Sequence, residues 1–144
     1  MLVETVHVRP SRSKRDWQEL RDALKAASMV AVLVDGTVDW TTLMAVARVI
    51  ALSDARVVAG YGERSEELHD LVDLIARSER ELGPITTFEN GSLDVFISNI
   101  TFTYRGLLDI NDQDRKTLIC YVSESESIPP HLELTIDAMR RRHL

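Results

Sequence analysis

The stretch MVAVLVDG, residues 29–36, does most to decide the fold of this 144-residue chain. Its six consecutive apolar residues leave no polar face, which is typical of a strand buried on both sides in a parallel sheet. Asp35-Gly36 follows as a turn signal. Other short runs that fit strands lie at 56–61, 85–88 and 118–123, and a less regular run at 2–8 favours an edge strand.

Amphipathic stretches alternate with these runs. Apolar residues recur at spacings of three and four in five segments, which predicts helices. The segments hold Trp17, Leu20 and Leu24, then Leu43, Met44, Ala47 and Ile50, then Leu68, Leu71, Val72 and Ile75, then Leu93, Phe96, Ile97 and Ile100, and then Leu132 and Ile136. The alternation predicts an α/β fold, a three-layer sandwich in which helices flank a mostly parallel sheet of about five strands. The chain length fits a single α/β domain, residues 1–144.

Two segments are less regular. Residues 101–104 fit either a helix or a strand, because Ile100, Phe102 and Tyr104 also alternate. Residues 105–116 are mostly polar and predict a loop.

The composition is that of a globular protein, with 44% hydrophobic and 28% charged residues. No run approaches the roughly 20 apolar residues of a membrane-spanning helix, and the first residues lack the pattern of a secretory signal. Cys120 is the single cysteine and lies inside an apolar run, which predicts an inert thiol and no internal disulfide. We therefore expect a cytoplasmic protein without a cofactor or a membrane partner.

Charge is distributed unevenly along the chain, whose net charge is −6. Basic residues cluster near both ends, whereas residues 16–137 hold 22 Asp and Glu but 10 Lys and Arg, a balance near −12. An acidic body disfavours nucleic acid as the main partner, because nucleic acids are polyanions. It favours a basic protein partner.

Acidic residues follow several of the predicted strands. In a parallel sheet the carboxyl ends of the strands meet at one edge, where functional residues of α/β proteins gather. The residues expected to bind a partner there are Asp35, Asp39, Tyr61, Glu63, Glu66, Glu89, Glu124 and Glu126, with Trp40 as a further aromatic side chain. Acidic nuclease inhibitors dock basic proteins through such charge complementarity. Carboxylates gathered in this way can equally hold Mg²⁺.

A partial glycine motif and a histidine are candidates for chemistry at this edge. Gly60-Tyr61-Gly62 lies where a dinucleotide-binding fingerprint would lie, but Ser65 replaces its third glycine and Glu63 adds negative charge. A tight turn explains these glycines more simply. His69 lies one helical turn before Asp73, which is short of the three or four ligands of a metal site. No metal site is therefore assigned, and His69 is the candidate general acid/base.

Several short motifs follow one another between residues 56 and 93. Tyr61-Gly62 ends a strand, His69-Asp70 and Asp73 lie on the next helix, and Thr86-Thr87-Phe88 and Ser92-Leu93 come after it. This pattern resembles a group of small bacterial proteins catalogued as a domain of unknown function. That group tends to have Trp in place of Tyr61 and Phe88, and His in place of Glu89. The resemblance implies a compact α/β fold and no known activity.

Two functions from different classes fit these patterns. We favour a non-enzymatic interaction module, most specifically an acidic inhibitor of the immunity or antitoxin type that binds a basic protein, because no catalytic set is complete. The alternative is a metal-dependent or nucleotide-binding enzyme or sensor, with Asp35 and Glu89 as metal ligands and His69 as general acid/base. A third interpretation is a homo-oligomeric structural subunit.

Overall fold

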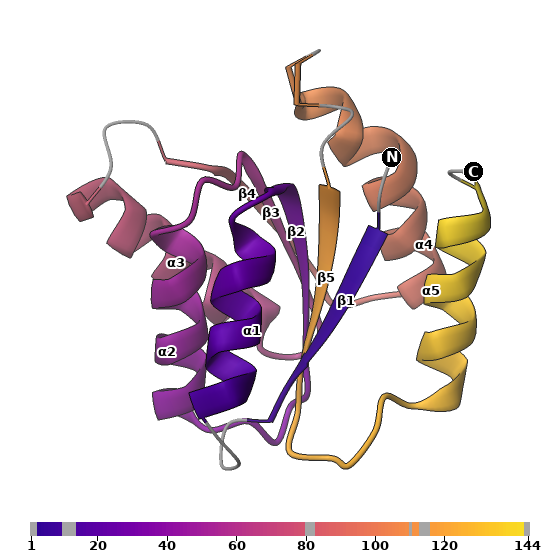
Figure 1. Cartoon of the computed structure of the whole chain (residues 1–144), viewed down its shortest axis with the longest axis horizontal. Coiled ribbons are helices and arrows are strands. Elements are labelled where there is room, and N and C mark those ends of the chain that lie inside the picture. The colour runs from indigo at the N-terminus through magenta and orange to yellow at the C-terminus, as the bar shows by residue number, and fades with distance from the viewer. Residues whose placement is uncertain (1–2, 10–13, 80–82, 110, 113–115, 143–144) are drawn as a thin grey trace.

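The computed structural model describes residues 3–9, 14–79, 83–109, 111–112 and 116–142. Five strands and five α-helices alternate within this part of the chain (Figure 1). The strands are β1 (Val3–Val8), β2 (Ala27–Val34), β3 (Val57–Tyr61), β4 (Ile85–Glu89) and β5 (Lys116–Val122). The helices are α1 (Lys14–Leu24), α2 (Trp40–Ala51), α3 (Ser65–Glu79), α4 (Leu93–Ser98) and α5 (Pro130–Arg142).

The five strands form one sheet in the order β1-β5-β2-β3-β4, and each neighbouring pair is parallel. Helices α1, α2 and α3 cover one face, and α4 and α5 cover the other (Figure 1). This arrangement confirms the predicted three-layer α/β sandwich. β1 is an edge strand, as its irregular pattern favours, although Leu2 of the predicted run lies outside the described residues.

Strands β2 and β5 lie inside the sheet because their residues are mostly apolar. Every residue of both strands is buried. Both begin two residues before the predicted runs. Ala27 and Ser28 are small enough to extend β2 into the interior. Lys116 can begin β5 because its ammonium group lies 2.6 Å from the Glu4 carboxylate on β1, and a partner of opposite charge offsets part of the loss of hydration.

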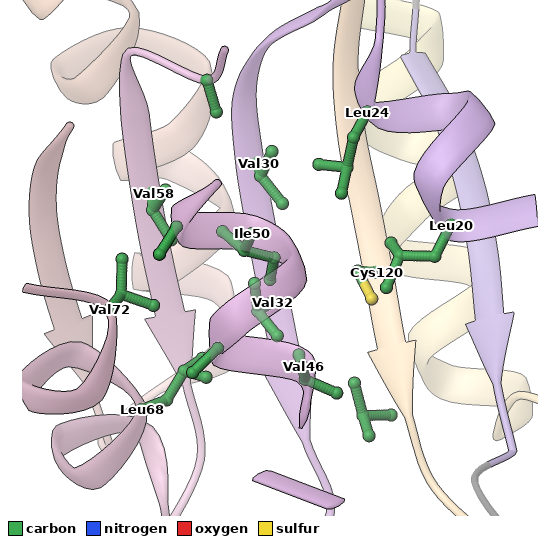
Figure 2. Packing of buried hydrophobic residues seen from close by; sticks show 14 of the residues in the cluster. Leu20, Leu24, Val30, Val32, Val46, Ile50, Val58, Leu68, Val72 and Cys120 are labelled. Carbon is green, nitrogen blue, oxygen red and sulfur yellow. The ribbon is translucent and has the colours of Figure 1, made fainter. Parts of the chain in front are cut away.

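Figure 2 shows the core between the sheet and helices α1 to α3. Its members include Leu20 and Leu24 of α1, Val46 and Ile50 of α2, Leu68 and Val72 of α3, and Val30, Val32, Val58 and Cys120 of the sheet. Each of these is at most 3% exposed, so the predicted apolar faces place all three helices on the sheet. Met44, predicted on the apolar face of α2, is instead 39% exposed. Cys120 is fully buried, as expected of a residue inside an apolar run, and burial raises the pKa of its thiol to about 12.

A less regular segment covers the other face. α4 continues into a π-helix, Asn99–Tyr104 (η1). Ile100 and Tyr104 are buried against the sheet, whereas Phe102 is 67% exposed. The segment that fitted either structure is therefore helical, and its alternation is coincidental, because residues four apart lie on one side of a helix.

The loop predicted over residues 105–116 needs correction at both ends. It begins with a short 3₁₀ helix, Arg105–Leu107 (η2), and its last residue starts β5. Leu108, directly after η2, is buried and anchors the chain there. A mostly polar stretch gives no sequence signal for this burial.

The α-helices are short, between 6 and 15 residues. Within the described part of the chain, no helix is both long and apolar enough to cross a membrane.

Candidate functional site

The carboxyl ends of all five strands lie at one edge of the sheet, which we call the carboxyl edge; the opposite side is the amino edge. From β2 the chain passes to α2 on one face, but from β5, the neighbour of β2, it passes to α5 on the other face. Chain connections that diverge in this way open a crevice beyond the strand ends, the usual place for ligands in such sheets.

Asp35, directly after β2, is held rigidly at this position. Its Oδ1 accepts hydrogen bonds from the Thr37 backbone N–H at 3.0 Å and the Thr37 hydroxyl at 3.1 Å. Its Oδ2 accepts one from the Ser123 hydroxyl at 3.0 Å. These bonds, above all that from the Thr37 backbone, hold the pKa of Asp35 below its usual value, so the side chain is a carboxylate at neutral pH.

Ser123 was not predicted as a site residue, yet it joins the ends of three strands. It is fully buried directly after β5, and its backbone N–H donates to the Val8 carbonyl of β1 at 3.1 Å. Its hydroxyl bonds to Asp35 beyond β2 and lies 3.0 Å from the Ser125 hydroxyl. The sequence signal was its position after a strand, but only the pairing of β2 with β5 makes it a neighbour of Asp35.

Asp35→Ala is expected to lower the free energy of unfolding at neutral pH by about 1–2 kcal/mol, because charge-assisted bonds are lost. A carboxylate whose pKa is lower in the folded than in the unfolded chain stabilises the fold above the unfolded pKa of about 3.9. That stabilisation disappears as the pH falls through the folded pKa. Urea unfolding at a series of pH values should therefore show the two proteins converging in acid. A difference that does not change with pH would contradict this assignment.

Asp39 is the N-cap of α2. Its Oδ1 accepts a hydrogen bond from the Thr42 backbone N–H at 2.8 Å, which is the main cause that lowers the pKa of this carboxyl group. Arg64 lies nearby, where its guanidinium group donates to the Val38 carbonyl and, at 2.8 Å, to Glu67. Asp39 thus has a structural role that accounts for its place in the sequence.

The glycine motif forms a tight turn after β3. Gly62 has a φ of +117°, and a Cβ atom there would lie 2.6 Å from the Val34 carbonyl oxygen. The Ser65 hydroxyl donates to the Gly62 carbonyl at 2.7 Å and closes the turn at the start of α3. The exposed Glu63 side chain lies against Gly36, since a Cβ on that glycine would approach Glu63 Oε2 to 2.7 Å. The turn geometry therefore explains both glycines without a nucleotide.

Glu89 ends β4 but turns toward the helices rather than outward. Its Oε1 accepts hydrogen bonds from the Asn99 amide and, at 2.8 Å, from the Tyr104 hydroxyl. Burial and, to a smaller extent, the Glu89 carboxylate raise the pKa of Tyr104. Tyr61 is likewise engaged, since its hydroxyl donates to the Gly91 carbonyl at 2.7 Å and its ring centroid is 5.1 Å from that of Phe96.

His69 lies on the other face of the sheet. Its Nδ1 is 2.9 Å from Asp70 Oδ1, its Nε2 is 3.6 Å from Asp73 Oδ2, and its ring centroid is 5.1 Å from that of Phe88. Because α3 and η1 cover opposite faces, His69 and Glu89 are on opposite sides of the sheet. Within the described ranges, no group of three or more His, Cys, Asp or Glu side chains could hold a metal ion.

The remaining residues of the predicted set are exposed glutamates. Glu63 and Glu66 flank the start of α3, and Glu124 and Glu126 follow β5. Arg9, at the end of β1, is 3.8 Å from Glu126 and 3.7 Å from Asp16. The carboxyl edge therefore presents a predominantly acidic surface, part of whose charge complements the amino-terminal ends of the helices.

The amino edge carries basic side chains beside acidic ones such as Asp54 and Glu79. Helices α1, α2 and α3 carry Arg21, Arg48 and Arg77 in their last turns. Together with Lys25, the first two line a groove of about 380 Å³. Basic residues at carboxyl-terminal helix ends complement the helix dipole, which is sufficient reason for their position.

The crevice itself lies between the first turns of α4 and α5 and has a volume of about 210 Å³. Its lining includes Asp35 and Tyr61 of the predicted set, together with Leu93, Tyr121, His131 and Leu132. These four were not predicted as site residues. Their only sequence signal was position near a strand end or a helix start.

Comparisons with known proteins give no match, whether with protein-family models, curated proteins or solved structures. The resemblance to the domain of unknown function therefore stays a prediction.

Proposed function

We propose that the protein is a non-enzymatic interaction module whose carboxyl edge binds a basic protein, as an inhibitor of the immunity or antitoxin type in the cytoplasm. The observation that carries this proposal is the exposure of Trp40. As the first residue of α2, it lies at the carboxyl edge and is 51% exposed. Tryptophan is among the residues that most often anchor protein interfaces.

The charges around this anchor support a basic partner. Asp35, Asp39 and Glu89 accept hydrogen bonds within the protein. Four further glutamates of the same edge expose their side chains to solvent, and one of them, Glu126, also lies 3.8 Å from Arg9. The four are Glu63, Glu66, Glu124 and Glu126. Exposed like charges steer an oppositely charged partner and raise the association rate more than the final affinity. The glutamates attract a basic partner over a distance, and Trp40 offers it an apolar contact from which water is excluded.

The metal-dependent and nucleotide-binding alternative has less support. Its proposed general acid/base, His69, lies across the sheet from its proposed ligand Glu89. The glycine turn is explained by its own backbone. No observation on the described residues favours this reading over the first.

Tagged wild-type protein and variants, compared in pull-downs from cells that naturally contain the protein, test the proposal. Trp40→Ala is expected to weaken capture of one stoichiometric basic protein by about 2 kcal/mol, or roughly 30-fold. The double variant Glu63→Gln/Glu66→Gln should mainly slow association and reduce its salt dependence, because rim charges act through a screened field.

The matched control is Asp54→Asn/Glu79→Gln, which removes two exposed charges from the amino edge. It should bind the captured protein as the wild type does. A partner held equally by all variants, or an acidic partner, would count against the carboxyl edge as the interface.

A further inference from the structure

The crevice at the carboxyl edge combines apolar walls with one carboxylate. Leu33 and Tyr121 of the sheet and Leu93 and Leu132 of the helices provide apolar surface, and Asp35 provides the carboxylate. Among the described residues that line it, none is a lysine or an arginine. The crevice therefore suits a group that has an apolar stem and a positive head.

Asp35 belongs to the same side of the sheet as these walls. Side chains alternate between the two faces of a strand, so a residue directly after β2 continues the face of Leu33, two positions earlier. Ser123 continues the face of Tyr121 in the same way, and its bond to Asp35 agrees with this placement.

The hydrogen bonds of Asp35 limit which positive head can bind. A carboxylate has about four lone-pair sites, and described residues occupy three of them, since Thr37 occupies two on Oδ1 and Ser123 one on Oδ2. Among the bonds made by this part of the chain, one site on Oδ2 remains. A guanidinium group binds best through two parallel bonds, one to each oxygen, whereas an ammonium group acts as a compact charge and needs only one.

We infer that the crevice receives a lysine side chain of the basic partner, with its methylene stem between Leu93 and Leu132 and its ammonium group on Asp35 Oδ2. This inference rests on the proposed function, and it names the partner residue that would enter the site. Burial of the stem and one charge-assisted bond make that lysine a second anchor beside the contact with Trp40.

The probe is N-acetyl-lysine methylamide, titrated into the full-length ¹⁵N-labelled protein at about pH 8, where histidine side chains are generally neutral. We expect saturable amide shifts centred on Leu93, Leu132 and Asp35, with a dissociation constant on the order of millimolar for so small a ligand. N-acetyl-arginine methylamide should bind several-fold more weakly. N-acetyl-norleucine methylamide, which keeps an apolar stem but has no charge, should bind more weakly still.

Two variants test the two halves of the site. Asp35→Asn keeps the shape but removes the charge, and it should weaken the lysine probe about tenfold. Leu93→Trp keeps the charge but fills the crevice, and it should abolish the saturable shifts. Asp54→Asn removes the same charge at the amino edge and should leave binding unchanged. Thermal unfolding of each variant confirms that it is folded.

Absence of saturable shifts, equal binding of the lysine and norleucine probes, or tighter binding of the arginine probe would each overturn the inference. Failure of the proposed function gives a different pattern. If Trp40→Ala releases the captured partner but Asp35→Asn does not, the proposed interface at the carboxyl edge is supported. The inference that a partner lysine enters the crevice is then wrong. If the probe binds the crevice but no partner is captured, the crevice is a site for a free primary amine. The inference that a partner protein supplies the lysine would then be wrong.

Discussion

Gly62→Ala is expected to lower the free energy of unfolding by about 3 kcal/mol or more. The φ of +117° is one that side-chain-bearing residues rarely adopt, and the new Cβ would lie 2.6 Å from the Val34 carbonyl oxygen. The contacted atom belongs to the backbone of a central strand, so no flexible side chain can move to relieve the clash. Urea unfolding monitored by circular dichroism gives the measurement.

Gly91→Ala is the control for this substitution. Its φ lies outside the strained region, and a Cβ there would meet no heavy atom within 4 Å. It should change stability by no more than about 1 kcal/mol. Equal effects of the two substitutions would show that the turn after β3 is not held as described. Because the Gly62 N–H also donates to the Glu89 carbonyl at 3.0 Å, the damage should extend to the end of β4.

Phe96→Ala is expected to lower the free energy of unfolding by about 3–5 kcal/mol, the usual range for a fully buried phenylalanine. Phe96 is completely buried between α4 and the sheet. Its ring lies 5.1 Å from that of Tyr61, and an aromatic pair adds about 0.5–1.5 kcal/mol to the burial of apolar area. The same unfolding experiment measures the loss.

Val95→Ala, one residue earlier on α4, is the matched control. Val95 is 54% exposed, so its truncation leaves no cavity and should change stability by less than about 1 kcal/mol. A small effect of Phe96→Ala would mean that α4 does not pack on the sheet through this residue. Loss of the Phe96 ring should also loosen Tyr61, and hence the lining of the crevice.

The helices and strands were predictable because their signals are local. The spacing of Leu68, Leu71 and Val72 places α3 on the sheet, and the unbroken apolar run of β2 predicts a central strand. The π-helix was not predictable in the same way. Its alternating apolar residues fit a strand or a helix equally, and packing of Ile100 and Tyr104 on the sheet favours the helix.

The candidate site was predictable as a region but not as an arrangement. Asp35, Tyr61 and the exposed glutamates were expected at the carboxyl edge because each ends a strand or comes shortly after one, and parallel strands end together. The sequence does not show that Glu89 turns toward Tyr104, or that Asp39 is committed to capping α2. Such roles depend on which hydrogen-bond partners fold nearby.

By itself the sequence determined the class of the fold, most residues of the core and the acidic character of one edge, since these follow from periodicity, strand ends and charge along the chain. The tertiary structure decided which distant residues meet. Asp35 and Ser123 are 88 positions apart and bond because β5 inserts between β1 and β2. Leu93 and Leu132 line the same crevice because α4 and α5 pack on one face. Strand order brings these groups together, and no local pattern encodes it.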